Sequence, residues 1–197
     1  MSAGIVMIPS MERCEMRAYF FSEDGREIPS VSEEEMREVD RIAVQDFQLG
    51  VLQMMENAGR NLASHVIDIF GDAAGSITVL AGSGGNGGGG LCCARHLHNR
   101  GFKVELLLTK HPQALEGAAR AQFTILSSIG ITAAESENAK KIISEATVVI
   151  DALVGYSLQG APRGNTEALI EASNEWARNV ISLDIPSGVD ATTGESP

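Results

Sequence analysis

The sequence has few of the features that would indicate an exported, membrane-bound or disulfide-rich protein. Its three cysteines, Cys14, Cys92 and Cys93, show neither a metal-binding spacing nor an even disulfide framework. The apolar run at residues 5–8 is cut by Pro9 and is too short for a signal core or a membrane span. We therefore expect a soluble cytoplasmic protein without a membrane partner.

Positive charge is also scarce, because 15 Lys and Arg stand against 26 Asp and Glu, for a net charge of −11. Such a chain repels a phosphate backbone unless it carries a local basic patch, and no Lys/Arg cluster is visible. We expect no nucleic-acid partner.

Proline is rare, at 6 residues, whereas glycine is frequent, at 21. Apolar residues make up 44% of the 197-residue chain, which is ordinary globular usage and is long enough for one domain with its own core. The glycines therefore indicate sharp turns rather than low complexity.

The N-terminal part divides into an arm and two helices. Residues 1–30 lack sustained periodicity and are interpreted as an arm laid over the domain, with a partly disordered leader as the open alternative. Ser32 and Glu35 form a capping-box pattern, so a helix is predicted from about residue 32, with apolar residues at helical spacing as far as Ala43. A second helix is predicted over residues 49–70.

From residue 77 onward, short apolar runs alternate with helical patterns. Strands separated by helices of this length require crossovers, so we predict an α/β fold: a three-layer Rossmann-like sandwich with a mainly parallel sheet covered by helices on both faces. The predicted strands are 77–81, 104–108, 148–151 and 180–184, with a short candidate at 131–133, and the predicted helices are 91–98, 114–128, 139–145 and 166–176.

A glycine-rich block, Gly82–Gly90, lies between the first of these strands and its helix. Glycines there allow backbone N–H groups to approach a ligand, and a helix N-terminus favours an anionic phosphate. A tight turn alone needs one or two glycines, so we interpret the block as an anion- or nucleotide-binding turn.

Two strands of the predicted sheet end in an acid, Asp151 and Asp184. Ligands of open α/β sheets bind beyond the carboxyl ends of the strands, so both acids are candidates for one shared site. The open roles are to orient ribose hydroxyls, to act as general acid and base, or to hold a cation with oxygens of Asn86 and Ser187.

Other enzyme motifs fit less well. Gly82, Gly84 and Gly87 satisfy the dinucleotide-binding spacing with Glu105 as a ribose acid, which leaves a small NAD-dependent oxidoreductase open, although many patterns fit so many glycines. A hydrolase with Ser83 as nucleophile is excluded because the last histidine precedes both strand-end acids. A triphosphatase loop is excluded because no lysine follows the glycines.

The histidines and cysteines of the next helix are interpreted as structural. His96 and His98 lie two residues apart and so point to different faces, which is poor geometry for a metal pair. Cys92 and Cys93 lie in the first turns of the predicted helix, where a thiolate gains some stabilisation, but burial is the favoured interpretation.

Four motifs occur in order: residues 54–59 (MMENAG), 82–91 (the glycine block and Leu91), 151–155 (DALVG) and 184–188 (DIPSG). Together they resemble the YjeF N-terminal domain family, over residues 31–197. The resemblance implies an NAD(P)H-hydrate epimerase, which interconverts the R and S forms of hydrated NADH or NADPH in cofactor repair. A non-catalytic nucleotide-binding or scaffold relative of the same fold is the alternative.

Carried over by position, the resemblance implies roles for individual residues. Asp184 and Asp151 are the expected catalytic residues, and a potassium ion is the expected cofactor. The expected potassium ligands are Asn86, Asp151 and Ser187. The expected substrate-binding residues are Gly85, Asn86, Gly87, Gly88, Gly89, Gly155, Tyr156, Ser157, Leu158, Gln159, Gly160, Ala161 and Asp184.

The chain departs from the family pattern in two places. The family's glycine loop carries polar residues where this chain has Gly85 and Gly89, and family domains continue with further sheet beyond residue 197. The expected partners are the hydrated nucleotide, a separate dehydratase that acts on the product and, since relatives often pair, a second copy in a homodimer.

Overall fold

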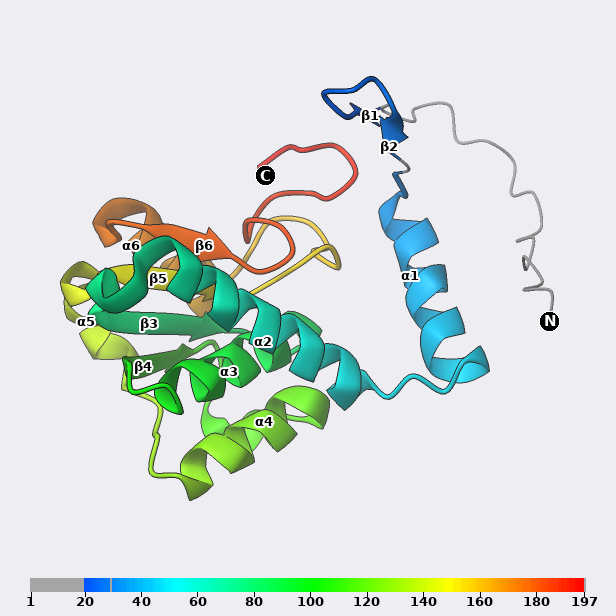
Figure 1. The fold of residues 1–197 in the computed structure, drawn as a ribbon. Coiled ribbons are helices and arrows are strands. Elements are labelled where there is room, and N and C mark those ends of the chain that lie inside the picture. The colour runs from blue at the N-terminus through cyan, green and yellow to red at the C-terminus, as the bar shows by residue number, and fades with distance from the viewer. Residues whose placement is uncertain (1–19, 29, 197) are drawn as a thin grey trace.

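The computed structural model describes residues 20–28 and 30–196. At its centre lies a four-stranded sheet in the order β4-β3-β5-β6, in which every pair is parallel (Figure 1). The strands are β3 (Ser76–Ala81), β4 (Lys103–Leu108), β5 (Val148–Ala152) and β6 (Val180–Ser182). The predicted fold class is therefore confirmed.

The strand sequences follow from burial. All five residues of β5 and five of the six in β3 are buried, because helices cover both faces of the two central strands. Strands of this kind are near-continuous apolar runs rather than alternating ones. This is why their positions could be predicted from the sequence.

Helices form the two outer layers. One face is covered by α2 (Val51–Phe70), α3 (Gly85–His98) and α4 (Gly117–Ser128). The other face is covered by α5 (Ala139–Glu145) and α6 (Asn165–Trp176). Short 3-10 helices at Gly71–Ala74, Pro112–Ala114 and Ser136–Asn138 lie in the connections.

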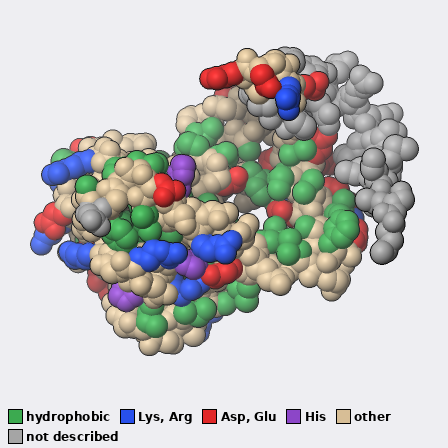
Figure 2. All heavy atoms as spheres, viewed as in Figure 1, with side chains coloured by type: hydrophobic (Ala, Val, Ile, Leu, Met, Phe, Trp, Pro, Cys, Tyr) green, Lys and Arg blue, Asp and Glu red, His purple; other side chains and the backbone are tan. Residues whose placement is uncertain are grey.

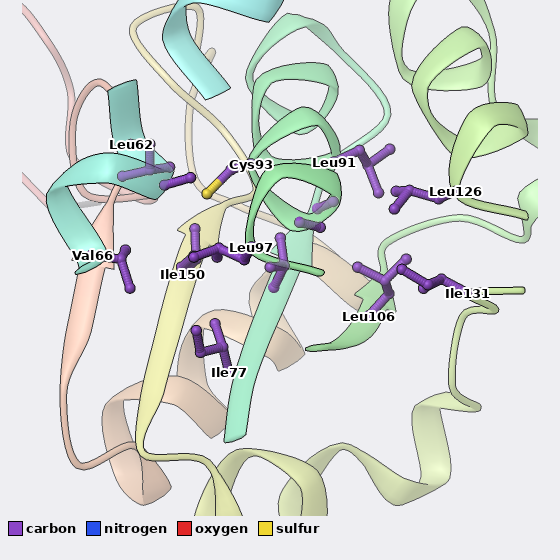
Figure 3. Packing of buried hydrophobic residues seen from close by; sticks show 14 of the residues in the cluster. Leu62, Val66, Ile77, Leu91, Cys93, Leu97, Leu106, Leu126, Ile131 and Ile150 are labelled. Carbon is purple, nitrogen blue, oxygen red and sulfur yellow. The ribbon is translucent and has the colours of Figure 1, made fainter. Parts of the chain in front are cut away.

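The larger core cluster lies between the sheet and the α2-α3-α4 layer. Figure 3 shows its members converging from the helices onto the strands, with Leu97 and Ile150 in the middle and Cys93 between α2 and α3. A smaller cluster on the opposite face contains Leu80, Ile143 and Leu169. Among the residues described, no helix has both the length and the apolar character needed to cross a bilayer.

The N-terminal elements stand apart from this body. A short hairpin, β1 (Phe20–Phe21) and β2 (Glu27–Ile28), precedes α1 (Glu33–Arg41), which continues into a π-helical turn at Ile42–Asp46 (Figure 1). The predicted capping box of Ser32 is present. No residue of α1 is buried, and Figure 2 shows apolar side chains on the surface of this part.

Three predictions differ from the structure. The helix after the glycine block begins at Gly85 rather than Leu91, so most of the glycines are helical. The candidate strand at 131–133 is only an isolated bridge between Ala133 and Leu106. The last strand ends at Ser182, because Asp184 has a φ of 73° and cannot continue an extended strand. Most of the predicted arm, residues 1–19 and residue 29, lies outside the described residues.

Candidate functional site at the carboxyl edge of the sheet

Asp151 joins β5 to the loop that follows β6. Its Oδ2 accepts hydrogen bonds from the Ser187 backbone N–H at 2.8 Å and from Ser182 Oγ at 3.1 Å. Its Oδ1 accepts from the Ser187 hydroxyl and, at 3.3 Å, from the Leu153 N–H. These hydrogen bonds fix the orientation of this buried side chain.

Ser187 connects Asp151 to the next turn of chain. Its Oγ accepts the Val154 N–H at 2.9 Å and also lies 3.0 Å from the Val154 carbonyl oxygen. A hydroxyl has one proton, so at any moment it donates either to Asp151 or to Val154. Oxygens of Asp151, Val154 and Ser187 thus gather at one point, as expected for strand ends of a parallel sheet.

Asp184 is held beside the same turn. Its Oδ2 accepts the Tyr156 N–H at 2.8 Å, and its own backbone lies in the left-handed region at a φ of 73°. Such strain in a non-glycine residue is found where the surroundings impose it, often at functional sites. The Asp184 side chain is exposed, unlike that of Asp151, so it is available to a ligand.

Gly155 marks the point where three segments meet. A Cβ at this position would lie 2.4 Å from Asp184 Oδ2 and 3.4 Å from the Asn86 side-chain amide carbon. Any larger residue would therefore displace Asp184. Asn86 and Asp184 approach each other across Gly155, and the preceding residue, Val154, contacts Ser187.

Most glycines of the block allow close packing of the backbone. A Cβ on Gly82, Gly87, Gly88 or Gly90 would lie within 2.5 Å of a neighbouring atom, so these glycines allow close packing. Gly89 is buried too, and its Cβ would lie 2.7 Å from a methyl group of Leu183. The expected contact of Gly87, Gly88 and Gly89 with the substrate stays a prediction.

The start of α3 remains open to a ligand. Gly84 has no atom within 4 Å of its hypothetical Cβ, and Gly85 meets only the flexible end of Met55. No side chain of the described residues caps this helix. The buried Nδ2 of Asn86 has no hydrogen-bond partner there. The first N–H groups of a helix need partners from outside, so the start of α3 presents unused donors.

The segment predicted to cover the substrate leads away from Gly155 and is mostly exposed. It is anchored by the Tyr156 hydroxyl, which donates to Asp40 of α1. Burial and this hydrogen bond raise the pKa of Tyr156 to about 12. The sequence carried no signal for the contact. The remaining residues of the segment follow Tyr156 directly in the sequence: Ser157, Leu158, Gln159, Gly160 and Ala161.

Glu105 does not lie at the site. It pairs with Lys103 at 2.9 Å and stands opposite Thr78 in the middle of the strand pair, rather than at the carboxyl end. In the dinucleotide-binding alternative Glu105 would contact a ribose at the strand ends, and its position in the middle of β4 does not support that role.

The two cysteines lie further along α3 than predicted, because the helix begins at Gly85. Both are buried, as the favoured interpretation held, and burial raises the pKa of both thiols, that of Cys92 to about 12. His98 is exposed, whereas His96 hydrogen-bonds to Glu56 of α2 at 2.7 Å.

The fold and this edge define a Rossmann-like α/β protein with an oxygen-rich site at the strand ends. Residues 51–197 match the family described as YjeF-related protein N-terminus, and the chain belongs to that family. A protein named NAD(P)H-hydrate epimerase from Dehalogenimonas lykanthroporepellens is 43% identical over 92% of this chain and 74% of its own length. Another protein of that name, from Rhodopirellula baltica, is 32% identical over 86% of this chain and 70% of its own length.

Two further relatives extend the comparison. The bifunctional NAD(P)H-hydrate repair enzyme Nnr of Moorella thermoacetica is 34% identical over 83% of this chain, and the match spans 32% of that protein. The crystal structure of yeast ynu0 superposes with a TM-score of 0.77 over 84% of this chain and 74% of that one. At 23% identity, it supports the fold alone.

Proposed function

We propose that this chain is an NAD(P)H-hydrate epimerase, which interconverts the R and S forms of hydrated NADH and NADPH in the cytoplasm. The observation that carries the proposal is the exposed Asp184 carboxylate, held by the Tyr156 N–H beside Asn86 at the strand ends. It supplies a positioned acid next to unused hydrogen-bond donors.

The substrate's phosphate or sugar portion binds at the start of α3. Free N–H groups there and the positive end of the helix dipole favour an anion, and Gly84 and Gly85 leave room for it. The chain from Gly155 to Ala161 then covers the nucleotide. Its position depends on the hydrogen bond from Tyr156 to Asp40.

The reacting carbon bears a hydroxyl and lies next to the ring nitrogen. Asp184, as general acid, delivers a proton to this hydroxyl, the carbon–oxygen bond breaks, and the departing water leaves an iminium cation. Water then adds to either face of the cation, and the Asp184 carboxylate takes up the released proton. Buried Asp151 lends negative charge to the surroundings of the cation.

The oxygens at this edge also fit a potassium ion. The Ser187 hydroxyl lies within hydrogen-bond distance of both Asp151 and the Val154 carbonyl, and a hard cation takes oxygen ligands. The Asn86 side chain lies beside Gly155, and turning its amide over exchanges the unpartnered Nδ2 for the amide oxygen, the atom that a cation would bind. Asn86, Asp151 and Ser187 are the proposed ligands, and the ion would hold the loops in place electrostatically.

A comparison of salts tests this without measuring activity. If potassium binds, the melting temperature is higher in potassium chloride than in sodium chloride at equal ionic strength, and Asn86→Ala abolishes the difference. Equal melting temperatures in the two salts would reject the ion site.

The reaction is tested by incubating pure S-hydrate with the protein and following the R form above its spontaneous rate. Asp184→Asn should lower kcat by about 100-fold or more, the usual contribution of a general acid, with a smaller change in KM. Asp68→Asn, the same charge change on an exposed residue of α2, is the matched control. An unchanged kcat in Asp184→Asn would reject the assignment.

The same assay addresses the alternatives. A protein that binds the hydrate without accelerating exchange would be a non-catalytic relative, and a separate dehydratase would then have no epimerised product to receive. Gly89 stands where the family has a polar residue, and the Leu183 side chain occupies the space beside it. The catalytic efficiency of the epimerase therefore depends on how the site works without that polar contact.

A further inference from the structure

A second cluster of reactive side chains lies between α2 and α3. Gly59 brings the two helices unusually close, since a Cβ there would lie 2.6 Å from the Cys92 Cβ. Glu56, one turn before Gly59, is thereby placed against the face of α3 that carries Cys92 and His96. These two residues are four apart and so share one face of the helix.

The donor atoms of the three side chains converge. Glu56 Oε2 lies 3.3 Å from Cys92 Sγ, Glu56 Oε1 lies 2.7 Å from His96 Nε2, and all three donors fall within 4.8 Å of one another. In a tetrahedral zinc site, bonds of about 2.0–2.3 Å place ligand atoms about 3.3–3.8 Å apart. Movements of about an ångström would therefore bring the three groups around one ion.

We propose that Glu56, Cys92 and His96 form a binding site for a zinc-like transition-metal ion. One sulfur, one imidazole nitrogen and one carboxylate oxygen are the donors that zinc prefers, whereas potassium or magnesium prefers oxygen alone. The cluster lies further along α3 than Asn86, so it is separate from the proposed epimerase site.

The three side chains of the cluster differ in their exposure to solvent. The Cys92 side chain is fully buried and that of His96 is 14% exposed, but that of Glu56 is 46% exposed. A metal ion reaches the cluster from the Glu56 side and keeps a solvent ligand there. The site then ties α2 to α3 by bonds that fix both helices.

Arg95 is the group that competes with the metal. Its guanidinium pairs with Glu56 and lies 3.4 Å from Cys92 Sγ, so in the metal-free protein it neutralises the carboxylate. When the ion binds, the thiol proton passes to solvent as the metal–sulfur bond forms, and the guanidinium faces the resulting thiolate. Removal of Arg95 should therefore strengthen metal binding, because one positive charge is taken away.

The test uses the full chain, freed of metal with a chelator and titrated with Zn²⁺ or Co²⁺. We expect one equivalent to bind, with a thiolate-to-cobalt charge-transfer band in the near ultraviolet. At free zinc 100-fold above Kd, the melting temperature should rise by about 5–10 °C.

Three variants decide the assignment. Cys92→Ala should remove the charge-transfer band and weaken zinc binding at least 10-fold. Cys93 is the adjacent buried cysteine and faces the core, so Cys93→Ala is the matched control. This variant should keep both the charge-transfer band and the zinc affinity. Arg95→Gln should bind zinc more tightly than the parent protein.

Other results overturn the proposal. The proposal is rejected if the parent protein binds no zinc. It is also rejected if the charge-transfer band survives in Cys92→Ala, because the thiolate ligand would then lie elsewhere. If Cys92→Ala fails to fold, His96→Gln replaces it, because His96 is partly exposed whereas Cys92 is fully buried. Unchanged zinc affinity in that variant would equally reject the site.

Discussion

Gly90→Ala tests whether the glycines of α3 are required for packing. A Cβ on Gly90 would lie 2.4 Å from the Ala152 Cβ and 3.5 Å from Val79 Cγ1. Carbon atoms in contact prefer about 3.5–4.0 Å, so α3 must move roughly 1 Å away from β5. Ala152 cannot turn aside, because its only side-chain atom is fixed to the backbone.

The magnitude follows from two opposing effects. Overpacking of a core costs about 1–3 kcal/mol, and this rigid contact belongs at the upper end. Alanine is favoured over glycine inside a helix by about 1 kcal/mol. The net loss is about 1–2 kcal/mol, which for a chain of this size lowers the melting temperature by roughly 2–8 °C.

Thermal unfolding followed by far-ultraviolet circular dichroism measures the shift. Gly85→Ala is the matched control, because its Cβ meets only a flexible methyl of Met55 at 3.3 Å, and its effect should stay within about 0.5 kcal/mol. If Gly90→Ala raised the melting temperature, helix propensity would dominate and the packing argument would be refuted.

Two further predictions concern the candidate site. Ser187→Ala should destabilise the protein by about 1–3 kcal/mol, because it leaves Asp151 and the Val154 N–H short of a partner; an unchanged urea midpoint would contradict this. An absorbance titration of the folded protein should show one tyrosine with a pKa of about 12, which Tyr156→Phe removes while Tyr19 remains. Because this pKa lies above the ordinary value of 10.0, the contact with Asp40 stabilises fully below pH 10 and is lost as the pH rises toward 12.

The sheet could be predicted from the sequence because its strands are apolar runs bounded by turns. The predicted helix over 139–145 has the observed bounds, and the β5 prediction is one residue short of the observed end at Ala152. The sequence predicts a turn at the glycine block because glycine is a poor helix former. Only the approach of β5 and α2 explains why its residues are helical.

The parts of the site that were missed depend on contacts between distant residues. Tyr156 and Asp40 are 116 positions apart, and His96 and Glu56 are 40 apart, so no local pattern links either pair. Gly59 carried the one available signal, since a glycine inside a long helix indicates a close approach by another element. Which element it approaches could not be read from the sequence.

The glycine-rich start of α3 has a consequence for when the site forms. Consecutive glycines from Gly87 to Gly90 would cost an isolated helix about 1 kcal/mol each, so this stretch has little tendency to coil alone. It becomes helical only against β3, β5 and α2, which supply its contacts. Asn86 therefore takes its place only after the surrounding layers have assembled, so the proposed nucleotide site forms late in folding.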